Sequence, residues 1–507
     1  EVTERLIPDW ASYINSEAEA LLTLKMPSLL RAITETLPLM RVQLVSDLQE
    51  LEINLPKPLF KSKSTKRLLT LSGDYFQSNK VLYYGSVDND INFNLEYRSL
   101  RDMSLAFQKG MISFGQTPLL SPINNGLVVR GTVPNLDIGD WIDLMGSGKS
   151  DLDVSEIVLN ISNIDIYGYA LGETLLEWRN LNDIAEIQLT GRMMAGSIFL
   201  DSRELTSTLD ARFQYIHWPH KDIDVFKGSD QSSLAVKLSI EDGKWLNRHL
   251  GRVDLNLNVE PESLSIDSIR LTGESFQLDG VGKSLEGVSL EKSSISFKLT
   301  SQDVRETMEE LGVNFYIEGE SLDLNASLEW NGELGDWQNP SLNGLVEFNL
   351  TNGSVPNIDP GAGRLAGLMS FTALPRRLAF DFRDVFMPGL SYDTIIAAYN
   401  IKSGVAVTSN FNLTGPIADI SITGDVDIAN QSYRQLAVVY DDTGDILPSL
   451  GFLASPGVGA ALLIFSQVFK QPIQGISRAA YCITGTWDEP LVDLLVNDLQ
   501  NSACADL

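Results

Sequence analysis

The sequence predicts a mostly β protein, in which a long, twisted antiparallel sheet curls into an apolar trough (a repeating β-groove) with a few helices. Apolar residues alternate with polar ones over most of the 507 residues, which is typical of strands with one apolar and one solvated face. Gly, Asn, Asp and Ser fill the gaps between these runs at hairpin-loop lengths. Few amphipathic helices are available to cover the apolar face, so the sheet must fold over on itself or leave its interior for a ligand.

Residues 1–56 predict a mixed initial segment of helix and strand. Apolar residues at helical spacing predict one helix over 10–22, and two prolines bound a second over 28–37. The main basic cluster follows this segment and consists of Lys57, Lys61, Lys63, Lys66 and Arg67. Because the cluster lies between two strands, it favours a solvated hairpin loop over an anion site.

Residues 57–358 predict the repeating antiparallel groove itself. The clearest alternation covers 322–330, and a short helix is expected near 301–311. Several strands end in a similar Leu/Ile-Thr-Gly step, as at 271–273 and 413–415. Recurrent units of this kind indicate an extended array.

Strand parity places one set of apolar side chains on the inner face of this sheet. The set consists of Leu255, Leu257, Ile266, Phe297, Leu322, Leu324, Leu328, Phe348, Leu350, Phe411, Leu413, Ile420 and Ile422. An apolar interior that is open along its length fits acyl chains, which need burial but no hydrogen bonds.

Residues 359–507 predict a distinct C-terminal region that begins with a helix. Asp359 is a helix-capping residue and Pro360 fits the first helical position, so a helix is expected over 361–374. Pro375 ends this helix, and an alternating strand follows it.

A second unusual stretch, 446–469, carries no charged residue and is long enough to cross a bilayer. Its prolines and glycines argue against a straight helix. Three structures remain open for it: a buried helix at the end of the sheet, an interfacial or re-entrant hairpin at a membrane, and a full transmembrane span.

Composition narrows the classes of partner. The net charge of −29, from 38 basic and 67 acidic residues, argues against nucleic acid, since phosphate binding needs clustered Lys and Arg. It also argues against adhesion of the whole surface to anionic lipid.

Catalytic and metal-binding patterns are weak throughout the sequence. His217 and His220 have the spacing of two metal ligands, but Pro219 and the flanking strand pattern favour a surface loop. Nucleophile and phosphate-loop motifs are missing, so we expect neither an enzyme nor a cofactor. Cys482 and Cys504 are too few for a disulfide scaffold, and their state is left open.

Six stretches carry a resemblance to a known family. The densest is 363–386, GRLAGLMSFTALPRRLAFDFRDVF, and the others are 389–404, 415–433, the apolar 456–465, 481–490 and, upstream, 131–141 (GTVPNLDIGDW). In these stretches the chain resembles the AsmA-like proteins of Gram-negative envelopes and, among them, the YhdP family. The first 350 residues match this family mainly in pattern, and the segment after Pro490 has no family motif.

The resemblance implies a groove that bridges the periplasm and carries phospholipids between the inner and outer membranes without a catalytic step. It implies the C-terminal part of such a protein, without the N-terminal inner-membrane anchor, acting as a monomer with its C-terminal end at the outer membrane. Membrane contact would then come from Phe452, Leu453, Leu462, Leu463, Ile464 and Phe465.

Arg376 and Arg377 would pair with lipid phosphates in this picture, or else serve the helix end and an ion pair with Asp381 or Asp384. The competing function is an envelope assembly scaffold that grips an outer-membrane protein by strand pairing.

Overall fold

The structure is a computed structural model of the 507-residue chain. It describes all residues except 1–12, 27–36, 102–103, 117–124, 142–153, 167–168, 182–183, 202–206, 220–232, 247, 261–262, 286–291, 314–316, 335–339, 356–389, 417–418, 441–477, 488–489, 496–503 and 505–506.

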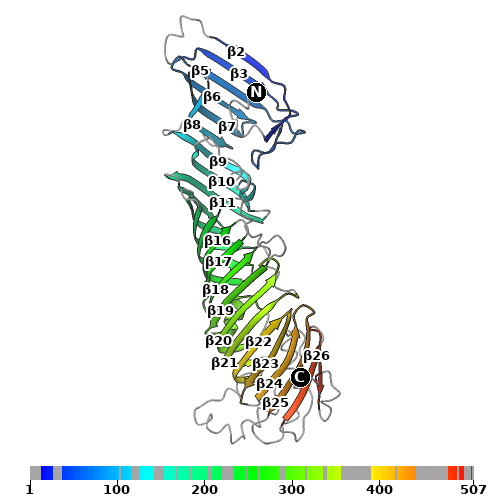
Figure 1. Cartoon of the computed structure of the whole chain (residues 1–507). Helices are drawn as coiled ribbons and strands as arrows, with labels where there is room; N and C mark the ends of the chain where they lie inside the picture. Colours follow the sequence, from blue (N-terminus) through cyan, green and yellow to red (C-terminus); the bar gives the residue numbers. More distant parts are fainter. Residues whose placement is uncertain are drawn as a thin grey trace. The chain divides into compact units, whose positions relative to one another are not determined.

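The chain divides into two compact units, Glu1–Leu234 and Ala235–Leu507. Within each unit, strands follow one another side by side in chain order (Figure 1). The predicted mostly β class, with a long sheet and few helices, is therefore confirmed. The predicted segment boundaries at 56 and 358 stay predictions.

The N-terminal unit contains fourteen described strands. Their bounds are β1 Ile14–Asn15, β2 Leu21–Lys25, β3 Met40–Ser46, β4 Glu52–Ile53, β5 Leu69–Tyr75, β6 Lys80–Val87, β7 Ile91–Ser99, β8 Leu105–Phe114, β9 Gly126–Asp137, β10 Val154–Ile166, β11 Tyr169–Leu181, β12 Ile184–Gly191, β13 Met194–Asp201 and β14 Ser207–Trp218. β1 pairs with β4, and the other strands form one continuous ladder from β2 to β14.

Strand β9 interrupts the antiparallel pattern, because it pairs in parallel with both β8 and β10. Parallel neighbours need crossover connections in place of tight hairpin turns. The family-like stretch 131–141 forms the second half of β9 and the helical turn after it, where the Trp141 indole N–H donates to the backbone oxygen of Lys57 (2.9 Å). This motif therefore marks the crossover in the ladder.

The C-terminal unit contains thirteen described strands and one short helix. The bounds are β15 Leu234–Trp245, β16 Arg248–Glu260, β17 Ser263–Thr272, β18 Phe276–Leu285, β19 Lys292–Ser301, α3 Val304–Glu310, β20 Glu318–Asn331, β21 Asn343–Val355, β22 Leu390–Lys402, β23 Val405–Thr414, β24 Asp419–Asp427, β25 Ser432–Tyr440, β26 Arg478–Gly485 and β27 Pro490–Leu494. Each strand from β16 to β27 pairs with the next in antiparallel fashion.

Helix α3 confirms the helix expected near 301–311. The Asp303 side chain caps it by accepting from the backbone N–H of Glu306 (3.0 Å). Its last residue, Glu310, accepts from the backbone N–H and the hydroxyl of Ser275 (3.1 and 2.8 Å). Val304 is fully buried against the inner face of the sheet, so α3 closes one end of several strands.

The helix expected over 10–22 is wrong in its described part. Leu21–Lys25 is strand β2, and Leu22 lies opposite Leu44 of β3. The helical pattern contained only a few apolar residues, and pairing with a partner distant in sequence decided the local structure.

The solvated loop expected for the basic cluster is wrong for Lys61, whose exposed fraction is only 2%. Its ammonium group donates to the backbone oxygens of Leu51 (2.6 Å) and Ser62 (3.1 Å), and burial lowers the pKa of this lysine. The neighbours of Lys61 behave as expected, since Lys66 forms an exposed ion pair with Asp47.

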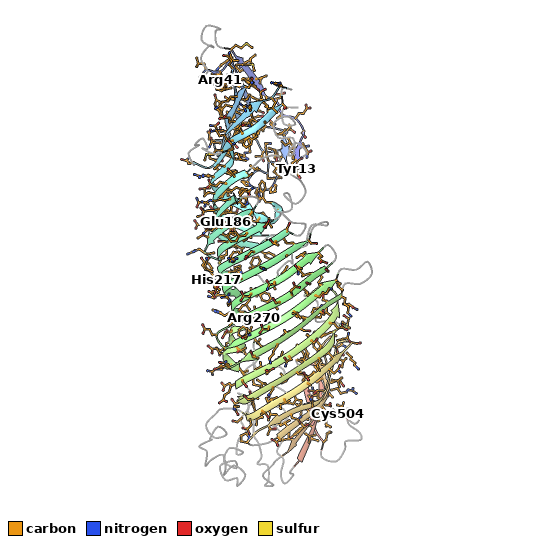
Figure 2. The ribbon with its side chains drawn as sticks, turned by 60° about the vertical axis from the view of Figure 1, so that its left-hand side comes forward. Tyr13, Arg41, Glu186, His217, Arg270 and Cys504 are labelled. Carbon is orange, nitrogen blue, oxygen red and sulfur yellow. A yellow bond between two sulfur atoms is a disulfide. The ribbon has the colours of Figure 1, made fainter. Side chains whose placement is uncertain are left out.

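A disulfide between Cys482 and Cys504 ties the C-terminal tail to β26. Both cysteines are buried and pack with Leu436 and Val438 of β25. Cys504, which belongs to the tail without a family motif, therefore packs on one face of the sheet near its C-terminal edge. Figure 2 labels Cys504 at this place.

Candidate functional site

The candidate site is the apolar face of the C-terminal unit. Strand register aligns its side chains in rows that run across the strands. One row consists of Leu322, Leu350, Ile395, Leu413 and Ile420. A second consists of Leu255, Ile269, Gly280, Phe297, Ala326, Val346 and Tyr399. All thirteen residues that strand parity assigned to the inner face lie in rows of this kind, on one face of the sheet.

Two β-bulges keep the apolar side chains on this face. In β17, Ile266 pairs with Gly282 and Ile269 pairs with Gly280, so β17 has one extra residue between these two pairs. The alternation of side chains between the two faces shifts by one residue at this point. In β23, a register shift between Thr408 and Phe411 does the same. The inner face therefore stays apolar on both sides of each bulge.

Burial of the inner-face side chains varies along the strands. Near one strand end, Phe276, Leu322 and Leu350 are buried together with α3, and near the other, Trp330 and Ile401 are buried. Between these buried edges lie partly exposed apolar side chains, which we call the floor. The floor consists of Leu255, Leu257, Ile266, Ile269, Ile295, Phe297, Leu324, Leu328, Val346 and Phe348. An apolar floor between two closed edges is a surface that can hold an apolar ligand.

The inner face changes character from β22 onward, where its side chains are buried. Leu413 of β23 is 1% exposed and Ile483 of β26 is fully buried. The Phe348 ring stacks on Tyr399 (6.5 Å between centroids) and meets the edge of Phe411 (6.4 Å). The strands from β22 to β26 therefore cover this end of the inner face with their own side chains.

The N-terminal unit carries a comparable apolar row, which parity had not assigned to the site. The row consists of Leu44, Leu71, Gly85, Phe93, Ile112, Val129, Ile157, Trp178, Ile187, Ile198 and Ala211. Most of these side chains are partly exposed, as on the floor of the C-terminal unit. The alternation of apolar and polar residues in the sequence was the signal that could have identified these side chains.

Aromatic rings and glycines adjoin on this N-terminal inner face. Tyr75, Tyr83, Tyr97 and Phe107 form a series of edge-to-face contacts with centroids 6.3, 5.7 and 5.4 Å apart. A Cβ added to Gly73 would lie 2.8 Å from the Tyr83 ring, so the glycine makes room for the ring. These contacts make the inner face of the N-terminal unit closely packed and apolar.

The opposite face of the C-terminal unit is polar and its charges are paired. Lys298 contacts Asp323 (2.7 Å) and Arg252 contacts Asp254 (2.9 Å). A hollow of about 750 Å³ lies here, and its lining combines charged residues such as Asp254, Arg270 and Lys298 with apolar ones, among them Val281 and Leu345; Arg270 is labelled in Figure 2. We place the apolar site on the other face, because the rows there consist of apolar side chains across many strands.

No three metal-ligating side chains lie together among the described residues. His217 lies on β14 with its ring 5.3 Å from that of Tyr215, and His220 lies outside the described residues. Within the described ranges, no helix has the length and apolarity needed to cross a bilayer.

The remaining predicted site residues lie outside the described residues. These are Arg376, Arg377, Phe452, Leu453, Leu462, Leu463, Ile464 and Phe465, together with the helix over 361–374 and the stretch 446–469. Their roles stay predictions.

The fold and the floor define a class: an antiparallel β-sheet protein with one polar face and one apolar face that runs across many strands. Comparison with known families makes this specific. The model of a family described as YhdP protein matches residues 4–492, so the chain belongs to the YhdP family. This confirms the resemblance seen in the sequence motifs.

A similar curated protein is the "Intermembrane phospholipid transporter YhdP" of Escherichia coli (strain K12). It is 23% identical over 476 residues, which cover 89% of this chain and 37% of that protein. The chain therefore spans little more than a third of the relative's length. No solved structure matches the chain.

Proposed function

We propose that this chain forms part of a non-catalytic apolar groove that carries phospholipids between the inner and outer membranes of a Gram-negative envelope. The observation that carries the proposal is the partly exposed apolar floor between two closed edges in the C-terminal unit. The similar protein from Escherichia coli, named as an intermembrane phospholipid transporter, supports the same substrate.

The physical basis is a transfer between two apolar environments. Each buried methylene contributes about 0.8 kcal/mol relative to water. A groove that buries acyl chains as a bilayer does therefore removes the free-energy cost of moving the lipid through water. It also holds the lipid no more tightly than the membrane does. Such transport needs no catalytic group and no bond cleavage, in keeping with the chemistry of the floor.

The proposal places the chain in the periplasm, with its C-terminal end at the outer membrane and contact through 446–469. The buried disulfide supports an oxidising compartment, because such bonds persist in the periplasm and are rare in the cytosol. The chain would act there as a monomer.

Lipid analysis of the purified chain tests the proposal. The protein is purified in mild detergent from a Gram-negative host and examined by native mass spectrometry, and its lipids are extracted and identified. We expect several phospholipid molecules per chain. A folded, monomeric chain free of lipid, also after incubation with phospholipid vesicles, would show that the groove does not hold lipid.

One observation favours the scaffold as a second candidate. Strand β2 pairs only with β3 among the described residues, and its Leu21, Leu22 and Leu24 are 70%, 64% and 54% exposed. An exposed apolar edge strand is a template for strand addition. This function predicts that a peptide of alternating apolar and polar residues binds the chain, measured by fluorescence anisotropy, and that Leu24→Lys abolishes binding. Unchanged binding by a folded Leu24→Lys variant would reject β2 as the docking edge.

A further inference from the structure

Arg248 is a partly exposed arginine that contacts no carboxylate among the described residues of the C-terminal unit. Its guanidinium instead lies over the Trp245 ring, 4.8 Å from the centroid. The other arginines whose side chains the structure describes in this unit each contact a carboxylate: Arg252, Arg270, Arg305 and Arg434. A guanidinium without an ion pair keeps its N–H donors available for an anion, and phosphate matches their geometry.

Arg248 begins β16 on the apolar side of the sheet. Val253 belongs to the inner face, because it is in register with Leu271, which packs against the inner cluster. Leu250 lies on the same face, since a Cβ added to Gly243 would be 3.0 Å from Val253 and 3.7 Å from Leu250. Arg248 precedes Leu250 by two residues in the strand and therefore shares this face.

Helix α3, which closes one edge of the groove, ends beside Arg248. The helix begins at β20, where a Cβ added to Gly319 would lie 3.1 Å from Val304. It contacts β16 as well as β20. After its last turn, a Cβ added to Gly312 would lie 2.9 Å from the Cγ of Arg248. The closed edge therefore runs from β20 to β16, and Arg248 marks its end.

Apolar side chains border the guanidinium and lead toward the floor. Leu246 and Val313, on the two segments that meet at Arg248, are 41% and 45% exposed. Leu255, a floor residue of the same strand, is seven residues further along (248 to 255), or about 23 Å. One leaflet of a bilayer, head groups included, is about 20 Å thick. A phospholipid with its head group at Arg248 can therefore extend its acyl chains to the floor.

The charges of α3 restrict the kind of head group that fits. The helix and its capping residue carry one basic residue, Arg305, and four acidic ones: Asp303, Glu306, Glu309 and Glu310. These carboxylates repel a ligand of net negative charge. A head group that carries an ammonium group beside its phosphate has no net charge and avoids this repulsion. The site therefore favours a zwitterionic head group such as phosphoethanolamine.

We propose that Arg248 binds the phosphate of a zwitterionic phospholipid at the edge of the groove, where α3 ends. The inference rests on the proposed function and adds to it a place at which the head group is held. The Trp245 ring orients the guanidinium by a cation–π contact, and the guanidinium N–H groups donate to the phosphate oxygens. The acyl chains lie toward the floor.

The test separates the phosphate from the acyl chains. Phosphatidylethanolamine and diacylglycerol of equal chain length each displace a fluorescent diacylglycerol, a probe without phosphate, from the purified full chain. Arg248→Met keeps an unbranched side chain but removes the charge. We expect it to bind phosphatidylethanolamine about tenfold more weakly, the usual effect of losing a charge-assisted hydrogen bond, and diacylglycerol unchanged. Arg305→Met, which removes an arginine of α3 that is paired with Glu318, should bind both lipids like the wild type.

Two further ligands test the class of head group. Phosphatidylglycerol of equal chain length, which is anionic, should bind the wild-type chain about threefold more weakly than phosphatidylethanolamine, because of the carboxylates on α3. Glycerophosphoethanolamine, the head group without acyl chains, should displace no probe at the same concentrations. Tighter binding of phosphatidylglycerol would overturn the zwitterionic assignment. Displacement by glycerophosphoethanolamine would overturn the link to the groove, because it would show a site for free phosphate esters.

The variants decide the role of Arg248 itself, with urea unfolding as the check of their folding. Wild-type affinity of a folded Arg248→Met chain for phosphatidylethanolamine would overturn the site and leave the groove intact. Equal losses for phosphatidylethanolamine and diacylglycerol would also overturn it, since Arg248 would then serve only the fold. If the wild-type chain binds neither the probe nor any phospholipid, the proposed function itself fails and this site fails with it.

Discussion

Leu324→Asp is the sharpest perturbation of the floor. Leu324 lies in register with Leu299 and Phe348 and is partly exposed. The new carboxylate must remain hydrated, so an acyl chain cannot cover this point of the floor. Two to three methylenes then lose burial worth about 0.8 kcal/mol each, or about 2 kcal/mol in total. Lipid binding should weaken about 30-fold.

The neighbouring residue supplies the matched control. Asn325→Asp adds the same charge on the same strand, but Asn325 is exposed on the polar face, opposite Lys298. We expect its lipid affinity to change little and its free energy of unfolding to fall by about 1 kcal/mol at most, because the new carboxylate loses the hydrogen bond to Asp323 and lies opposite Glu347 as well as Lys298. Leu324→Asp itself should lose about 1 to 2 kcal/mol of stability, because its side chain is only partly buried.

The assay is displacement of a fluorescent phospholipid, run beside urea unfolding of each variant. A folded Leu324→Asp chain with wild-type lipid affinity would refute the assignment of the floor. Equal losses in Leu324→Asp and Asn325→Asp would attribute the effect to charge in general and refute it as well.

Three further predictions concern stability. Gly85→Ala should destabilise the chain by about 2 kcal/mol in urea unfolding, since its Cβ would collide with the backbone oxygen of Thr70; an unchanged midpoint would contradict the packing of this row. Cys504→Ala should cost about 3 kcal/mol, because the disulfide to Cys482 closes a loop with a sequence separation of 22; wild-type stability would show that the bond adds nothing. The pKa of Asp427 lies below its ordinary value, because the side chain and the backbone N–H of Asn430 donate to its carboxylate. That stabilisation is present above about pH 4 and is lost as pH falls through the lowered pKa, so the wild-type chain should lose more stability than Asp427→Asn between pH 5 and pH 3.

The apolar face could be predicted because period-two patterning survives in the sequence even where the sheet is irregular. Leu264 and Ile266 are followed by Ile269 and Leu271, and the spacing of three between the middle pair is the bulge itself. Burial of apolar side chains fixes such register, since a slip by one residue would expose the whole set.

Other features depend on contacts that patterning does not contain. The helical pattern before Leu21 gave way to pairing with β3, a partner some twenty residues away in sequence. The bond between Cys482 and Cys504 depends on where the tail returns to β26. Each is a non-local property, set by tertiary structure.

Site-specific photocrosslinking along β20 tests the central claim most directly. A photoreactive phenylalanine analogue replaces residues 323 to 328 one at a time, and the chain is irradiated in cells and examined for bound phospholipid. The groove predicts crosslinks at 324, 326 and 328, which share the apolar face, and none at 323, 325 and 327, which face solvent. Crosslinks without this period of two, or confined to the polar face, would contradict the account.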